Sequence, residues 1–172
     1  MPKILEDARI RLISVARKQA LTNGYPGMTI RSVAQECGYS VGTVYNYFRS
    51  KEQLLAEVML EDWQQEVEEM KEKCRKASPA VALEAIYNGL SHFRSLYSSV
   101  FEDRSAQRSY ALSDRSYHKI LLEQLSAILE DVLKQNGLDN QSILPRFLAE
   151  SLLTWEGKCP YEDLAMILNK LL

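Results

Sequence analysis

The chain has 172 residues, 46% of them hydrophobic and 26% charged, which is enough apolar material for one sizeable core or a small module attached to a larger one. It contains no apolar run of about 18 residues, the length that spans a membrane, and its first residues form no apolar signal region. We therefore expect a soluble, cytoplasmic protein with no membrane partner. The net charge of -2 is unevenly distributed, because residues 1–51 carry eight basic and three acidic side chains and the remainder carries -7.

Glycine and proline are few, and apolar residues recur every three or four positions, so the predicted fold class is all-α. The first helix is expected over residues 4–23, with Gly24 as its stop. Thr29 is a good N-cap for a short helix that ends at Gly38, and Ser40 caps a second helix over residues 41–48. Ser50 and Gln53 have the spacing of a capping box that opens a long helix to about Arg75.

Residues 30–49, IRSVAQECGYSVGTVYNYFR, have the spacing of a helix-turn-helix. The small Ala34 lies where two helices would cross closely, Gly38 suits the left-handed turn, and Val44 faces back onto the preceding helix. Three helices joined by short turns would form a compact head over residues 1–50. The helical remainder, residues 51–172, would form a second domain.

The segment from Met28 to Leu55 resembles the signature of the TetR (tetracycline repressor) family, and the close match extends over about residues 10–56. The resemblance implies a DNA-binding transcriptional regulator whose partner is double-stranded DNA with an inverted-repeat operator. It also implies a homodimer, with residues 51–172 as a helical effector-binding and dimerisation domain, and most members of the family repress.

The predicted DNA-contacting residues combine backbone contacts with base contacts. Thr29 and Ser40 place hydroxyls and amides at helix N-termini, where phosphates are favoured, and Gly42 allows a close approach to the bases. Only Asn46 in the second helix can bind adenine through two hydrogen bonds, so we expect sparse base readout and specificity from DNA shape. The full predicted set is Thr29, Arg31, Ser40, Val41, Gly42, Thr43, Tyr45, Asn46, Tyr47 and Lys51.

Aromatic residues alternate with arginines between residues 92 and 118, a mixture that would suit a planar or anionic small-molecule effector. The alternative is that these are core aromatics beside surface arginines. The candidate ligand-binding residues are His92, Phe93, Tyr97, Phe101, Tyr110, Tyr117 and His118. Neither histidine has ligands at metal-binding spacing, so we expect no metal and no cofactor.

Helices are also expected over residues 79–97, from Asp114 to Asn136, over 141–156 and over 161–172. The last two carry more apolar residues than one helix pair can bury, which predicts an intermolecular four-helix bundle; packing within one chain is the alternative. The candidate interface residues are Leu144, Phe147, Leu148, Leu152, Trp155, Leu164 and Leu168.

Three cysteines at positions 37, 74 and 159 lack a paired motif, so free thiols are expected, with a redox sensor as the alternative. The leading hypothesis is a repressor modulated by a small molecule. An activator, or a regulator whose second domain binds a protein partner, is the alternative. An enzyme is a third possibility, but no nucleophile, phosphate loop or metal spacing supports it.

Overall fold

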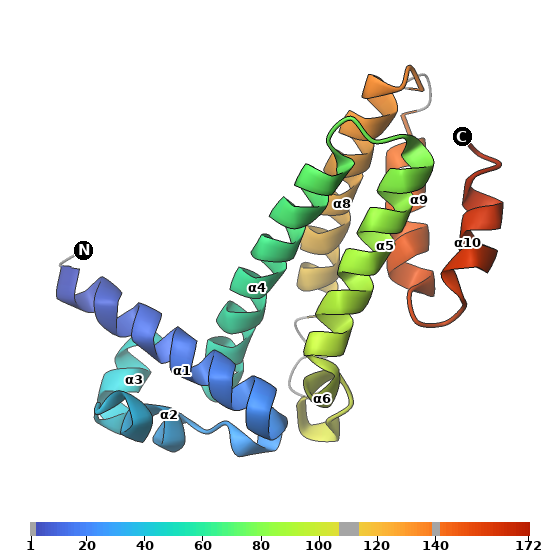
Figure 1. The fold of residues 1–172 in the computed structure, drawn as a ribbon. Coiled ribbons are helices and arrows are strands. Elements are labelled where there is room, and N and C mark those ends of the chain that lie inside the picture. Colours follow the sequence, from blue (N-terminus) through green and yellow to red (C-terminus); the bar gives the residue numbers. More distant parts are fainter. Residues whose placement is uncertain (1–2, 107–113, 139–141) are drawn as a thin grey trace. The chain divides into compact units, whose positions relative to one another are not determined.

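A computed structural model describes residues 3–106, 114–138 and 142–172, and all regular structure within these ranges is helical (Figure 1). The all-α prediction is therefore confirmed. The helices are α1 (Lys3–Gly27), α2 (Ile30–Cys37), α3 (Val41–Tyr47), α4 (Lys51–Cys74), α5 (Pro79–Leu96), α6 (Ser98–Phe101), α8 (Asp114–Gln135), α9 (Leu144–Trp155) and α10 (Tyr161–Leu168). None of the described helices is long and apolar enough to cross a membrane.

The chain forms two compact units. Unit 1 comprises Met1–Trp63 and Leu96–Leu112, and unit 2 comprises Gln64–Ser95 and Ser113–Leu172. The helix α4 supplies residues to both. The domain boundary expected near residue 50 thus falls inside unit 1. This unit also includes the first half of α4 and the later segment Leu96–Leu112.

The turns of unit 1 follow from local chemistry. Gly24 interrupts α1 with φ 67° and ψ -179°, a conformation open to glycine, and one further turn ends at Gly27. Thr29 and Ser32 form a reciprocal capping box at the start of α2. Gly38 ends that helix in the left-handed region, with φ 73° and ψ 25°, and lets the chain turn into α3.

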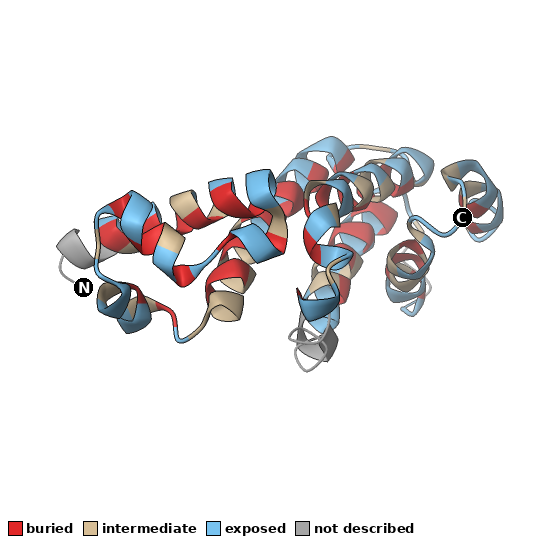
Figure 2. Cartoon of the chain, turned by 90° about the horizontal axis from the view of Figure 1, so that it is seen from below, coloured by how far each residue is buried: buried red, intermediate tan, exposed pale blue. Residues whose placement is uncertain are grey.

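The short helices α2 and α3 each bury one face and expose the other (Figure 2). Ala34 is 1% exposed and Val44 is fully buried, so the two helices meet through small and medium side chains. Phe48, directly after α3, is also fully buried. The remaining buried side chains of unit 1 come mainly from α1 and α4: Leu12, Ile13, Ala16, Ala20, Leu54, Leu55 and Val58.

Unit 2 packs the second half of α4 and α5 with α8, α9 and α10, and α8 lies along α9. Gly89 on α5 allows close packing, since a Cβ there would lie 2.9 Å from two Met70 side-chain atoms. Both C-terminal helices are shorter than expected. Pro145 lies in the first turn of α9, where it needs no helical hydrogen bond, and α10 ends at Leu168 rather than at residue 172.

Gly38→Ala should lower the free energy of unfolding by about 1 to 2 kcal/mol, because no atom crowds the site and the left-handed backbone alone opposes a Cβ. Gly42→Ala is the matched control. It adds the same methyl group to open space within a helix and should be neutral or stabilising by up to about 1 kcal/mol. Urea unfolding measures both; equal destabilisation by the two variants would contradict this account of the turn.

Candidate nucleic-acid interface

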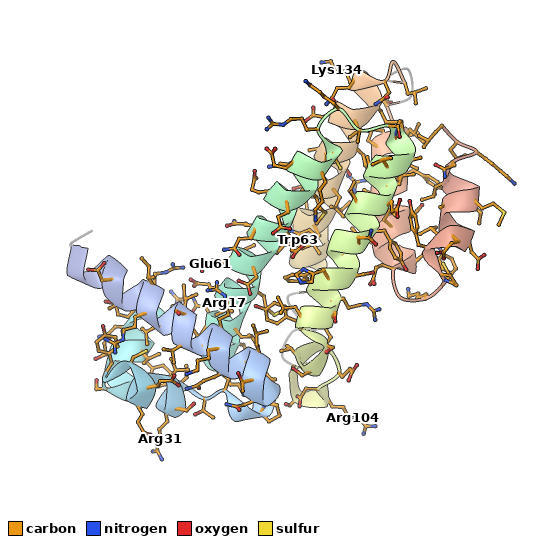
Figure 3. The ribbon with its side chains drawn as sticks, viewed as in Figure 1. Arg17, Arg31, Glu61, Trp63, Arg104 and Lys134 are labelled. Atoms are coloured by element: carbon orange, nitrogen blue, oxygen red, sulfur yellow. The ribbon has the colours of Figure 1, made fainter. Side chains whose placement is uncertain are left out.

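The ten residues predicted to contact DNA all reach the surface of unit 1, along α2, α3 and the start of α4. Seven of the ten are exposed, and Thr43, Tyr47 and Lys51 are half-buried. Arg31 extends from α2 away from the body of the unit (Figure 3) and forms no ion pair with a described side chain. The structure thus brings these residues to one accessible part of unit 1.

The outward face of α3 combines a glycine with exposed apolar and aromatic side chains. A Cβ on Gly42 would meet only the Ser40 Oγ, at 3.7 Å, so the backbone there is open to close approach. Val41 is 38% exposed and Tyr45 is 52% exposed. Because Val44 and Phe48 are buried on the opposite side, this face has a fixed orientation within unit 1.

The hydroxyls at the helix starts already have local partners. Thr29 Oγ1 accepts a hydrogen bond from the Ser32 amide at 3.0 Å, and Ser40 Oγ accepts one from the Thr43 amide at 3.0 Å. Ser40 Oγ also lies 2.9 Å from Thr43 Oγ1. These hydroxyls fix the start of each helix, and a hydroxyl oxygen keeps further hydrogen-bonding capacity for a ligand.

Polar contacts, partly buried, hold α2 against α1. Gln19 is 7% exposed and bridges the two helices: its Oε1 accepts from Ser32 Oγ at 2.7 Å, and its Nε2 donates to Glu36 Oε2 at 2.7 Å. Lys18 adds an exposed ion pair to Glu36 at 2.8 Å. The position of α2 therefore depends on directional bonds as well as on apolar packing.

Lys51 makes contacts within unit 1 that the sequence did not reveal. Its ammonium donates to the carbonyl of Tyr25 and lies 3.6 Å from the centroid of the Tyr25 ring, a cation–π geometry. Burial lowers the pKa of Lys51. The Tyr25 hydroxyl donates to Glu52 Oε1 at 2.7 Å, so these three residues tie the end of α1 to the start of α4.

The candidate effector residues are divided between the two units. His92 and Phe93 belong to unit 2, Tyr97 and Phe101 to unit 1, and His118 to unit 2. Tyr110 lies outside the described residues, as does the side chain of Tyr117. Phe93 and Tyr97 are buried, at 8% and 0% exposure, and His92 pairs with the buried Glu66.

Two cavities are described in unit 2, and neither is lined by a candidate effector residue. The larger, of about 470 Å³, lies between α8 and α9 and includes Glu130, Lys134 and Arg146 in its lining.

The candidate dimer residues divide into two groups. Five are packed inside unit 2, each at most 6% exposed: Leu144, Leu148, Leu152, Leu164 and Leu168. Phe147 and Trp155 remain on the surface, at 52% and 50% exposure. The sequence pattern could not separate these groups, because an apolar residue on an amphipathic helix looks the same whether its own chain or a partner covers it.

Four further apolar side chains on or beside these helices are exposed and were not among the residues predicted for the interface: Ile143, Met166, Ile167 and Leu171.

In unit 1, a short turn thus joins two small helices, and the second presents an accessible face, which is the arrangement of a helix-turn-helix. Comparison with known proteins agrees. Residues 12–58 match the model of the bacterial regulatory proteins of the tetR family. The HTH-type transcriptional regulator UidR of Escherichia coli (strain K12) is 32% identical over 57 residues, which cover 33% of this chain and 29% of that protein.

Solved structures extend the likeness to the whole fold. A transcriptional regulator from Rhodococcus sp. Rha1 is 22% identical with a TM-score of 0.55, covering 93% of this chain and 91% of that one. FadR from Bacillus subtilis, solved in complex with stearoyl-CoA, is 20% identical with a TM-score of 0.51, and 94% of each chain is covered. Residues 12–58 thus match the tetR family of bacterial regulatory proteins, and the fold as a whole is similar to that of these two solved regulators.

Tyr25→Phe should weaken the link between α1 and α4 in a pH-dependent way. The hydrogen bond from the Tyr25 hydroxyl is the main cause that lowers the pKa of Glu52. Its contribution to the free energy of unfolding is therefore present above the unfolded-state pKa of Glu52 and is lost as pH falls through the folded-state pKa. The variant should therefore lose stability at pH 7, by about 1 kcal/mol or less, and approach wild type near pH 3.

Urea unfolding at several pH values, with Tyr39→Phe as control, measures this difference. A loss of stability that is the same at pH 3 and pH 7 would show that packing, rather than the carboxylate, is responsible.

Proposed function

We propose that the protein is a sequence-specific regulator of transcription that binds double-stranded DNA through α2 and α3. The observation that carries the proposal is the exposed, unobstructed face of α3 at Gly42, held in place by the buried Val44 and Phe48. A helix presented in this way fits the major groove of DNA. The match of residues 12–58 to the tetR family supports the same function.

The proposed contacts are of two kinds. Asn46 and Thr43 would face base edges, Asn46 by two hydrogen bonds to adenine and Thr43 by its methyl group to thymine. Arg31 would add a base or backbone contact from α2. Thr29, Ser40, Tyr45, Tyr47 and Lys51 would bind the phosphate backbone, while Val41 and Gly42 allow close approach.

Lys51 can bind a DNA phosphate while it keeps its contacts with Tyr25. An ammonium group has three donors, and the Tyr25 carbonyl takes one of them. The cation–π contact and the hydrogen bond hold the side chain in one place before DNA arrives, which reduces the entropy lost on binding.

We further propose a homodimer formed through α9 and α10. Ile143, Phe147 and Trp155 recur at intervals of four and eight residues, so they share one face of α9 or its end, and Met166 and Ile167 are exposed on α10. Soluble proteins rarely leave so many large apolar side chains in water unless a partner covers them. The buried leucines of the same helices would support this surface from within.

For the regulation of DNA binding, we propose a repressor modulated by a small molecule bound in the second part of the chain. The support is fold-level: FadR from Bacillus subtilis, of similar fold, is solved with stearoyl-CoA. The second candidate is an activator, or a regulator whose unit 2 binds a protein partner. It is favoured by the close contact of Gly89 with Met70, which leaves no room even for a methyl group at that position.

Selection of bound fragments from a random-sequence DNA library tests the function directly. We expect an inverted repeat, since a two-fold dimer presents two identical α3 helices about one DNA turn apart, roughly 34 to 36 Å, or a multiple of it. Gly42→Asp should abolish binding, because it places a charged side chain between α3 and the groove while the exposed site preserves the fold.

Two companion variants sharpen this test. Gly42→Ala adds only a methyl group and should bind more weakly than wild type but measurably. Asn46→Ala should lose discrimination at one or two base positions, by about 1 to 3 kcal/mol each. Normal binding by Gly42→Asp, or selection of a single asymmetric site, would contradict the proposal.

Phe147→Glu and Ile167→Glu should each weaken the dimer at least about tenfold, because a buried charge at the centre of an interface lacks a partner. Val81→Glu on α5, at a similarly exposed position of 53%, is the matched control and should leave the dimer intact. Sedimentation over a range of protein concentrations measures the dissociation constant. Equal behaviour of all three variants would exclude α9 and α10 as the interface.

A further inference from the structure

A buried carboxylate in unit 1 joins three segments of the chain. Asp62 on α4 is 8% exposed, and its Oδ1 accepts a hydrogen bond from Arg17 Nε on α1 at 2.6 Å. Its other oxygen, Oδ2, accepts a hydrogen bond from the hydroxyl of Tyr97. Tyr97 is fully buried and lies in the sequence between the end of α5 and the start of α6. Arg17 also pairs with Glu61 at 3.0 Å, and Figure 3 shows these two side chains facing each other.

Both oxygens of this carboxylate thus have donors of fixed geometry. A buried charge without partners is strongly unfavourable, so the three side chains stabilise one another only when all are in place. Burial, followed by the hydrogen bond to Asp62, raises the pKa of Tyr97, and its hydroxyl therefore remains a donor at neutral pH. The network is a rigid, directional connection rather than a surface ion pair.

The position of the network along the chain is unusual. The chain leaves unit 1 directly after Trp63 and re-enters it at Leu96. Asp62 precedes the first of these crossings by one residue, and Tyr97 follows the second directly. The Tyr97–Asp62 hydrogen bond therefore links the two chain segments that flank these points. Arg17 links the same segments to α1.

The helix α1 is in turn the support of the helix-turn-helix. Gln19 holds α2 through Ser32, and the kinked end of α1 approaches α6, where a Cβ on Gly24 would lie 3.6 Å from that of Ser99. If the backbone at Asp62 or Tyr97 moved, either the hydrogen bonds of the network would be strained or α1 would move with it. The helices α2 and α3 would then move with α1.

We infer that Arg17, Asp62 and Tyr97 are positioning residues for operator binding, which hold α1, and with it the helix-turn-helix, in one orientation on the part of α4 that belongs to unit 1. This inference rests on the proposed function. None of the three residues touches the DNA. Their role is to hold the two recognition helices of a dimer at one separation, so that only one half-site spacing is bound well.

Binding to duplexes of different half-site spacing tests this role. The selected inverted repeat is compared with versions lengthened at the centre by one and two base pairs, and with a duplex that holds a single half-site. Each added base pair shifts one half-site by about 3.4 Å and rotates it about the DNA axis. The wild-type chain should bind the selected spacing best.

Tyr97→Phe removes one hydroxyl at nearly constant volume. We expect it to reduce the affinity ratio between the selected and lengthened duplexes by about two- to tenfold, the loss that follows from one hydrogen bond. Its affinity for the single half-site should stay within about twofold of wild type, because the DNA-contacting face is unchanged. Asp62→Asn, which keeps one acceptor oxygen, should act in the same direction.

Tyr87→Phe is the matched control. It removes a hydroxyl in unit 2 that donates to the Cys159 carbonyl at 3.2 Å, and it should leave the spacing ratio unchanged. An unchanged ratio in both Tyr97→Phe and Asp62→Asn would overturn the inference. So would an equal loss on the half-site and the full operator, since that result indicates only a destabilised head. A wild-type chain without specific DNA binding would overturn the proposed function itself, before any variant is compared.

Discussion

The helix-turn-helix of this protein is too short to be stable alone. Helices of eight and seven residues, α2 and α3, lie below the length at which an isolated helix persists in water. Their order comes from α1 and the first half of α4, whose apolar faces supply Leu12, Leu54, Leu55 and other fully buried side chains. The proposed DNA-contacting surface depends on this support, which explains why unit 1 extends well beyond residue 50.

Because of this dependence, several polar residues of unit 1 both stabilise the fold and are proposed to bind DNA. Thr29 and Ser40 cap α2 and α3, and Lys51 holds the end of α1; under the proposed function, the same residues also bind phosphates. A substitution at such a residue changes both stability and affinity, so the two must be measured together. Gly42 is different, because its contribution is the absence of a side chain, and it separates binding from folding most cleanly.

The elements of unit 1 could be predicted from the sequence because their signals are local. Thr29, Gly38 and Ser40 lie at the caps where the pattern put them, and Ile30, Val33, Ala34 and Cys37 are the buried face of α2. Contacts between distant residues could not be predicted. The hydrogen bond of Tyr97 to Asp62 joins residues 35 positions apart, and the sequence analysis assigned Tyr97 to an effector site. Likewise, periodicity marked the apolar residues of α9 and α10 without distinguishing Leu148, buried in its own chain, from Ile143, which is 72% exposed.

The central claim is that α3 enters the major groove while the remainder of unit 1 holds it there. A crystal structure of the full chain bound to its selected duplex tests this most directly. The account predicts α3 in the major groove, with Asn46 and Thr43 at base edges, Gly42 against the DNA, and Asp62 still bonded to Arg17 and Tyr97. A complex in which α3 faces solvent and the DNA lies across another surface would contradict it.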